Sequence, residues 1–330
     1  MARRRSFARN AAEYFLGRSL LLATQLLPAR LVAPTSRLLG RVLYGVAGGR
    51  RRVVRSNIRL AYGDHGDAPD PDAVGRAAFA GLCLSFMELA RAPNDRAWLP
   101  ARLTFKNPEN WDRLRSACKD GGVVLAGAHF GAYEIMGLVL SLHDMTPVTS
   151  ARPLDNPYLQ RWLARARSRY GQHMVSNRDS LSELFAALDA GRPVGVLTDL
   201  NHRRRRRIWV DYFGTAAATA PTAAVLAIRS GRPVVRVAAR RVGPPLHFEI
   251  DIGDLHYPRK NAGRRAETQR LMDTVTRELE EAVRADPGAW LWTHNRWKTR
   301  PRDDERKGTE DQENQECQGE PRNPGNEKQI

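Results

Sequence analysis

The 330-residue sequence has few cysteines and none of the glycine-rich signatures of nucleotide-binding proteins. Its three cysteines, Cys83, Cys118 and Cys317, are widely separated and show no metal-ligand spacing. This pattern argues against a disulfide framework and fits a reducing compartment. No Walker-type or dinucleotide-binding motif is present. The sequence therefore offers no metal-binding or nucleotide-binding signature from which to infer a function.

Acidic residues are nearly absent from the first 59 positions, which hold thirteen arginines and one acid, Glu13. Apolar stretches lie between the arginines, but the longest uncharged window, residues 19–29, is only eleven residues long. A membrane-spanning helix needs roughly 20 predominantly apolar residues. Signal-peptide cleavage chemistry is also missing. We therefore predict one or two amphipathic helices lying on a membrane surface, with a spanning helix or a basic hairpin packed on the main domain as alternatives.

The net charge of +17 indicates an anionic partner. Nucleic acid, an anionic membrane, and an acidic protein or substrate all fit so basic a chain. A nucleic-acid-binding arm would not need the apolar segment SLLLATQLL, so anionic membrane lipids are favoured and no nucleic acid is expected. An uninterrupted basic run, Arg203–Arg207, is either a solvated surface or a contact for headgroup phosphates or an acidic carrier protein.

Composition divides the chain into three parts. Residues 1–63 are the basic, apolar segment that we expect to associate with a membrane, and residues 64–300 form the main domain. Residues 301–330 contain almost no apolar side chains and cannot bury enough surface to offset chain entropy. We predict a disordered tail there, without a catalytic role.

Apolar runs and amphipathic segments alternate through the main domain. This alternation predicts an α/β fold with a mixed, mainly parallel sheet flanked by helices. The expected strands are Val123–Ala128, Pro147–Ala151, His173–Ser176, Val194–Thr198, Val234–Ala239 and His247–Ile252. The expected helices are Pro71–Arg91, Pro108–Lys119, Gly131–Leu142, Pro157–Tyr170, Ser180–Ala190, Ala220–Ser230 and Arg264–Ala285.

His129 and Glu134 stand out at the end of the first expected strand. Residues five apart do not share a helix face, so the two side chains can meet only if His129 lies in the turn before the helix. An imidazole there is exposed at the carboxyl end of a strand, where open α/β sheets place their ligand sites. Glu134 would hold the second ring nitrogen and fix its tautomer. The pair then has the arrangement of a general base for a hydroxyl.

Four further positions fall at strand ends or turns. Arg152 offers a guanidinium fork for phosphate or carboxylate, and Asn156 is placed to cap the following helix. Arg167 lies near the end of that helix, where a cation also stabilises the helix terminus. Asp199 closes a buried strand, either as part of a cleft or as a cap for a turn.

The segment IWVDYFG at 208–214 precedes another expected helix. Phe213 and Gly214 are followed by Thr219, which is a plausible N-cap. Aromatic side chains beside a helix N-terminus suggest a site for an apolar chain together with an anionic group.

Taken in order, these residues resemble a known family. Asn57, Glu88, the pattern of His129 and Glu134, RPLDNP at 152–157, Arg167, Asp199 with Asn201, VDYFG at 210–214 and WLWTHNRWK at 290–298 carry the likeness. The chain resembles bacterial lipid A biosynthesis lauroyl/myristoyl acyltransferases, within the wider glycerolipid acyltransferases in which four residues separate a histidine from an acid. The resemblance extends from the N-terminal segment to about residue 300.

The resemblance implies an enzyme on the cytoplasmic face of the inner membrane. Such an enzyme moves a fatty acyl group from acyl carrier protein, or from acyl-CoA, to a hydroxyl of a glycolipid. It implies that His129 is the base and that Glu134 orients it, with Arg152, Arg167 and Asp199 supporting the site or binding substrate. No cofactor, metal or covalent acyl-enzyme is implied.

Two alternatives to this function remain open. The acceptor could be a phosphatidylinositol mannoside or another glycolipid or lysophospholipid instead of a lipid A precursor. A different class, a non-catalytic membrane- or nucleic-acid-binding protein, is suggested only by the charge of +17.

Overall fold

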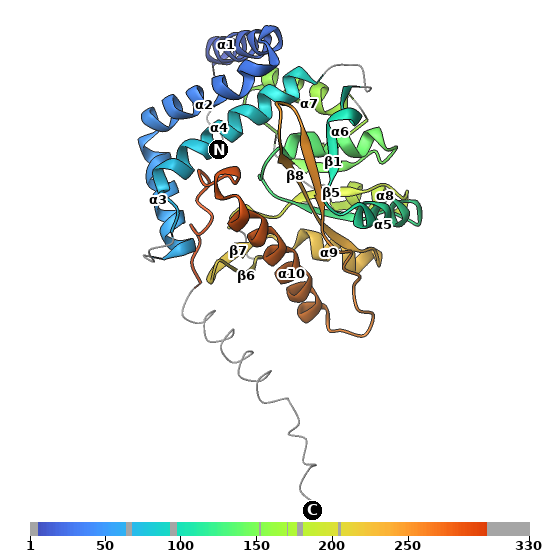
Figure 1. The fold of residues 1–330 in the computed structure, drawn as a ribbon. Helices are drawn as coiled ribbons and strands as arrows, with labels where there is room; N and C mark the ends of the chain where they lie inside the picture. Colours follow the sequence, from blue (N-terminus) through green and yellow to red (C-terminus); the bar gives the residue numbers. More distant parts are fainter. Residues whose placement is uncertain are drawn as a thin grey trace, which may run out of the picture.

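A central β-sheet with helices on both faces forms the main part of the computed structural model (Figure 1). The structure describes residues 6–63, 68–92, 98–151, 153–169, 171–176, 181–203 and 206–301. Arg152 and residues 302–330 lie outside these ranges, so the expectations for that side chain and for a disordered tail stay predictions.

The sheet has seven strands in the order β1-β9-β8-β2-β5-β3-β4. Five neighbouring strands, from β8 to β4, run parallel, whereas β9 is antiparallel to β8 and carries β1 parallel to itself. The predicted mixed, mainly parallel sheet is therefore confirmed. The strands are β1 (Leu103–Phe105), β2 (Val124–Gly127), β3 (Val148–Ala151), β4 (His173–Ser176), β5 (Val194–Leu197), β8 (Val234–Arg241) and β9 (Phe248–Ile252).

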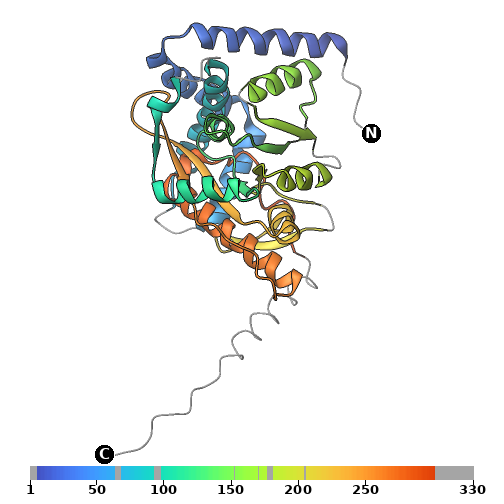
Figure 2. The same ribbon diagram turned by 90° about the vertical axis from the view of Figure 1, so that its right-hand side faces the viewer.

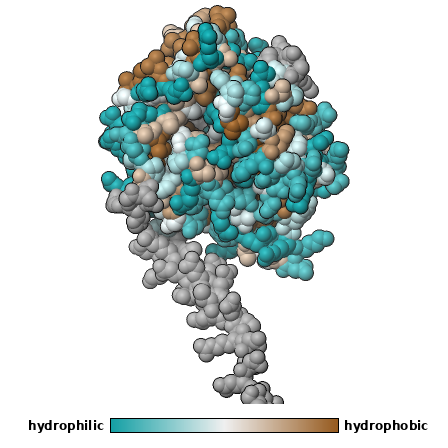
Figure 3. Space-filling view, in the orientation of Figure 1, coloured by the Kyte–Doolittle hydropathy of each residue, from teal (hydrophilic) through white to brown (hydrophobic). Residues whose placement is uncertain are grey.

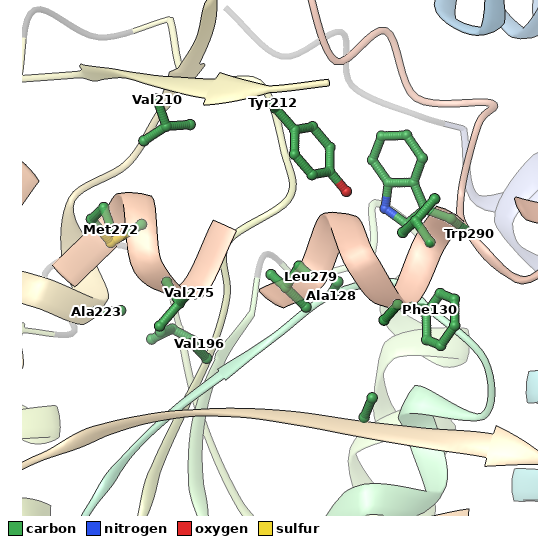
Figure 4. Packing of buried hydrophobic residues seen from close by; sticks show 14 of the residues in the cluster. Ala128, Phe130, Val196, Val210, Tyr212, Ala223, Met272, Val275, Leu279 and Trp290 are labelled. Carbon is green, nitrogen blue, oxygen red and sulfur yellow. The ribbon is translucent and has the colours of Figure 1, made fainter. Parts of the chain in front are cut away.

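Two buried hydrophobic clusters fill the space between the sheet and its helices. One cluster lies against α5 (Pro108–Lys119), α6 (Tyr133–Leu142) and α7 (Pro157–Ser168). The other lies against α8 (Leu181–Asp189), α9 (Thr222–Ser230) and α10 (Arg264–Ala285), and Figure 4 shows its packing around Val275 and Leu279 of α10. Because both faces are covered, β2 is buried along its whole length, which explains its uninterrupted apolar sequence.

The segment expected to form an aromatic site is a β-hairpin. Strands β6 (Ile208–Tyr212) and β7 (Thr215–Thr219) are joined by Phe213 and Gly214, whose φ angles are 59° and 68°. Positive φ at both loop positions is typical of a type I′ turn. Phe213 is buried, and its ring lies near Trp292 and Trp297.

The predicted capping role of Thr219 is wrong. Helix α9 begins at Thr222 with Pro221 before it, and no side chain caps this end. The Thr219 hydroxyl is buried, donates to the Ala217 carbonyl and accepts from Arg296. The strands of the hairpin extend the chain through Thr219, so the helix starts later than its apolar pattern suggests.

Three helices form the N-terminal segment, one more than the upper expectation. They are α1 (Phe7–Leu26), α2 (Ala29–Val46) and α3 (Gly48–Tyr62), and all three pack against α4 (Pro71–Arg91). Figure 2 shows α1 lying along one edge of the molecule. Helix α1 ends before Pro28, and a second break at Ala47 separates α2 from α3.

Most of the large apolar side chains exposed in the described part of the chain lie on α1 and α2. They are Phe7, Phe15, Leu16, Leu20, Leu22, Leu26, Leu31, Leu38, Val42, Leu43 and Val46. Figure 3 shows hydrophobic residues gathered at the top of the molecule, where Figure 1 draws α1. Among the described residues, α4 alone has the length and hydropathy to cross a membrane, and 56% of its apolar window is buried inside the protein.

Gly40 determines how closely α2 approaches α4. A Cβ atom at this position would lie 2.6 Å from the backbone nitrogen of Ala80, a distance that side chains do not adopt. Because the obstacle is backbone, the two helices would have to move apart to accept even a methyl group.

We expect Gly40→Ala to lower the free energy of unfolding by about 1–3 kcal/mol through this overpacking. Gly45→Ala is the matched control, because it lies on the same helix with no heavy atom within 4 Å of the new Cβ. The control should be neutral or slightly stabilising, since alanine favours helix over glycine. Chemical denaturation of both variants measures the difference, and equal stabilities would contradict this account of the helix contact.

Candidate active site

His129 and Asp199 are brought together by the pairing of two neighbouring parallel strands. Gly127 of β2 is in register with Leu197 of β5. His129 and Asp199 each lie two residues beyond these partners, at the carboxyl edge of the sheet. The ring Nδ1 of His129 lies 3.0 Å from Oδ1 of Asp199. The predicted position of His129, in the turn between strand and helix, is confirmed.

The Asp199 carboxylate is almost fully buried and is satisfied by three donors. Besides the His129 ring, its Oδ2 accepts from the backbone N–H of His129 at 2.9 Å and from Nε1 of Trp290 at 2.9 Å. An ionised carboxylate only accepts, so Nδ1 must carry the proton in this contact. The neutral ring then presents an unprotonated Nε2, which has no protein partner in the described part of the chain. That nitrogen is the free basic atom of the site.

The two groups change each other's pKa in opposite directions. Burial works against the charged form of His129, but the charge and hydrogen bond of Asp199, together with the charge of Glu134, raise the pKa of the imidazole above its ordinary value. Burial likewise opposes ionisation of Asp199, yet the charge of His129 and the hydrogen bonds from His129 and Trp290 lower the pKa of this carboxyl to about 2. Asp199 therefore stays ionised, and His129 is a stronger base than an ordinary imidazole.

Glu134 does not hold the imidazole as the sequence predicted. It lies in the first turn of α6, where its two carboxylate oxygens accept from Nε and Nη2 of Arg167 at 2.8 and 2.6 Å. The guanidinium fork matches the carboxylate geometry, and both groups are largely buried. Nδ1 of His129 is occupied by Asp199, so the orienting acid comes from a neighbouring strand end, and Glu134 influences the ring through its charge.

The backbone of the turn that carries His129 is also held by contacts with β8 and with the C-terminal segment. Gly131 has φ of 58°, and a Cβ there would lie 2.2 Å from the carbonyl oxygen of Ala239, so only glycine fits. The next residue, Ala132, donates its backbone N–H to the same oxygen at 2.7 Å. On the C-terminal side, Leu291 donates its N–H to the His129 carbonyl at 3.1 Å. These contacts fix the backbone on either side of the imidazole.

A second buried ion pair fastens α4 beside this turn. Glu88 of α4 accepts from Nε and Nη2 of Arg241 at 2.8 and 2.8 Å, and Ser85 accepts from the same guanidinium. Burial raises the pKa of Glu88 in spite of the charge and hydrogen bonds of Arg241, which act in the opposite direction. The pair connects α4, the helix that supports the N-terminal segment, to β8, the strand next to Gly131.

A largely apolar cavity of about 110 Å³ lies beside the turn that carries His129 and is lined there by Ala128 and Phe130. It lies between α6 and the face of the sheet that carries Leu125, Gly127, Gly195 and Leu197. Tyr133, whose ring centroid is 5.1 Å from that of His129, lines the cavity, as do Glu134 and Arg167. The cavity is thus apolar in its depth and charged on one side near the imidazole. Among the described residues, no three His, Cys, Asp or Glu side chains gather as metal ligands.

The other predicted site residues fall into two groups. Asn156 caps α7 as predicted, accepting from the N–H of Tyr158 and Leu159 at 3.0 and 3.3 Å. Its amide also donates to the Asn10 carbonyl, so it ties α1 to α7. Phe213, Gly214 and Thr219 belong to the hairpin and do not line the apolar cavity beside His129.

Trp290 and the pair of Glu88 with Arg241 were missed as site residues from the sequence. Trp290 lies more than 90 positions after Asp199, and no local pattern connects an indole to a distant carboxylate. The strands did hold a usable signal for the dyad. The expected strands Val123–Ala128 and Val194–Thr198 each end directly before an ionisable side chain, which places His129 and Asp199 opposite each other if the two strands pair in parallel.

Replacing Asp199 with asparagine should lower the pKa of His129, because the burial that opposes the charged ring then acts without its main counterweight. Glu134→Gln should lower the pKa less, since this carboxylate does not touch the ring and is neutralised by Arg167. NMR titration of the histidine ring resonances measures both changes. An unchanged His129 titration in the asparagine variant would contradict the dyad.

Comparison with known proteins identifies the wider group. The sequence profile of the bacterial lipid A biosynthesis acyltransferases matches residues 2–299. The chain is 24% identical over 255 residues to a lipid A biosynthesis palmitoleoyltransferase of Escherichia coli strain K12, covering 76% of this chain and 80% of that protein. It is 25% identical over 184 residues to the lipid A biosynthesis lauroyltransferase of the same organism, covering 54% of this chain and 57% of that protein.

A lipid A biosynthesis acyltransferase of Haemophilus influenzae is 23% identical over 263 residues, covering 76% of this chain and 78% of its own length. The profile match extends over nearly all the described residues and includes both members of the His129–Asp199 dyad. The chain therefore belongs to the bacterial lipid A biosynthesis acyltransferase family.

Proposed function

We propose that the protein is a membrane-associated O-acyltransferase that moves a fatty acyl group to a hydroxyl of a lipid A precursor. The donor is the thioester of acyl carrier protein or of coenzyme A. The observation that carries this proposal is the free Nε2 of His129, backed by a buried carboxylate and placed beside an apolar cavity. Family membership supports the reaction class and the lipid A acceptor.

In the proposed reaction, His129 acts as general base. Its Nε2 takes the proton of the acceptor hydroxyl, and the oxygen attacks the thioester carbonyl carbon to give a tetrahedral intermediate. As the intermediate collapses, the C–S bond breaks and the thiol leaves with the proton held by His129. Asp199 stabilises the imidazolium that forms between these steps, because it remains ionised throughout. The products are an ester and a free thiol.

The cavity beside α6 is proposed to receive the acyl chain of the donor. Its walls are the apolar side chains of Leu125, Met136 and Leu140 together with glycine backbone. Arg167 and Glu134 line the same cavity and form its charged side. A thioester bound between the apolar interior of the cavity and its charged side would have its acyl chain in an apolar space and its carbonyl group near the His129–Asp199 dyad.

Membrane association is proposed from the apolar surface of α1 and α2. Exposed leucine, valine and phenylalanine side chains alternate there with arginines, a composition typical of helices that lie in the headgroup region of an anionic membrane. The cytoplasmic face of the inner membrane would bring such a surface to both an acyl donor and a lipid acceptor. The interfacial arrangement is favoured over a spanning one because α1 and α2 contain arginines along their length.

We expect His129→Ala to reduce kcat for acyl transfer by about 10²- to 10⁴-fold, the typical contribution of a positioned base. Asp199→Asn should also reduce kcat strongly, since the ring loses the carboxylate that fixes its tautomer and supplies its counter-charge.

In the wild type, activity should fall as the pH drops through the raised pKa of His129, because the protonated ring cannot accept a proton.

His173→Ala is the matched control, since this exposed histidine lies on the edge strand β4. The assay uses purified enzyme, acyl carrier protein thioester and a lipid A precursor in mixed micelles. Flotation with anionic liposomes checks that each variant still binds membranes. Turnover of His129→Ala close to that of the control would reject the base assignment.

Deletion of the gene should remove one secondary acyl chain from the lipid A of the host. Mass spectrometry of the extracted lipids measures the loss, and complementation with the wild-type gene, but not with the His129→Ala gene, should restore it. Unchanged lipid A together with loss of an acyl chain from another glycolipid would assign a different acceptor.

A further inference from the structure

A second cavity, of about 430 Å³, lies between α2, α4 and the end of β8. Its lining is basic. Arg37 and Arg41 come from α2, Arg76 from α4 and Arg240 from β8. Arg241 also reaches the cavity, but its charge is neutralised by Glu88. None of these groups belongs to the His129–Asp199 dyad.

The charges of this cavity are poorly compensated. In the described part of the chain, Arg37, Arg41 and Arg240 form no ion pair, and Arg76 lies 3.8 Å from the exposed Asp70. Asp286 contributes a single carboxylate to the lining. Four guanidinium groups facing one space repel one another unless an anion enters. Their planar forks suit a phosphate group.

The position of the cavity favours an amphiphilic ligand. Arg37 and Arg41 are one helical turn apart on α2, and they are followed in sequence by Leu38 and Val42, two residues that are 59% and 54% exposed. Helix α2 thus presents arginines to the cavity and apolar side chains beside it. A lipid with a phosphorylated headgroup can satisfy both surfaces, with its phosphate in the cavity and its chains along the apolar face of α2.

The cavity also adjoins the catalytic turn. Phe130 lines both cavities, and Gly131 lines the basic one, so the turn that starts at His129 separates the two spaces. We propose that the basic cavity binds a phosphate group of the glycolipid acceptor and so directs its hydroxyl toward His129. This inference rests on the proposed function, in which the other cavity holds the acyl chain of the donor.

The test compares the double variant Arg37→Gln/Arg41→Gln with wild-type enzyme in the mixed-micelle assay. The acceptors are a phosphorylated lipid A precursor and the same glycolipid after phosphatase treatment. The double variant should raise KM for the phosphorylated acceptor at least about tenfold, the loss expected when a guanidinium–phosphate contact is removed. It should leave KM for the donor and kcat at saturating acceptor within about twofold.

Arg264→Gln/Arg265→Gln removes the same charge from the exposed start of α10 and serves as the control. It should not change either KM. With the dephosphorylated acceptor, the cavity variant and the wild type should have similar KM values. A rise in the donor KM, or an equal rise with both acceptors, would overturn the proposal, because the cavity would then serve the donor or act only through the fold.

Direct binding separates this inference from the proposed function. Wild-type protein should bind phosphorylated precursor in micelles without donor, and the Arg37/Arg41 variant should bind it at least about tenfold more weakly. If the wild type binds in this way yet transfers no acyl group, the reaction proposal fails and the phosphate site stands. Equal binding by both proteins would reject the phosphate site whatever the activity.

Discussion

The parallel pairing of β2 with β5 is the constraint on which the active-site geometry depends. The register of this strand pair alone places His129 beside Asp199, because each residue lies two positions past a pair of aligned strand residues. A buried carboxylate is tolerated only when its oxygens are satisfied. The three groups that satisfy Asp199 are the ring and backbone of His129 and the indole of Trp290. One carboxylate therefore fixes the tautomer of the imidazole and attaches the C-terminal segment to the sheet.

Two further buried ion pairs hold the layers around this turn. Glu134 with Arg167 joins α6 to α7, and Glu88 with Arg241 joins α4 to β8. Losing one partner of such a pair leaves an uncompensated charge, which costs more than replacing both partners together. Because of this asymmetry, Glu134 supports the site through its ion pair with Arg167 without touching the imidazole. It secures Arg167 beside the apolar cavity and adds its negative charge to that of Asp199 around His129.

Local patterns were enough to predict the main elements of the fold and one member of the dyad. Uninterrupted apolar runs identified the buried parallel strands, and α4, α5 and α10 begin and end where their sequence patterns do. The partner of His129 was misassigned because Glu134 is near in sequence, whereas Asp199 becomes near only through strand register. The hairpin around Phe213 was missed because its loop holds a bulky residue at positive φ, which the surrounding tryptophans stabilise. Tertiary contacts of this kind leave no local signature.

Helix α2 must pack closely against α4 and also present both arginine and apolar side chains on its other faces. Its buried residues, including Gly40, must approach α4 closely, and the two arginines that flank this glycine then face the space above β8. Leucine and valine side chains occupy the remaining face and stay exposed. Close packing at Gly40 therefore also brings Arg37 and Arg41 to the edge of the turn that carries His129. One helix contact and one strand pairing therefore bring the exposed apolar face of α2, the basic cavity and the His129–Asp199 dyad close to one another.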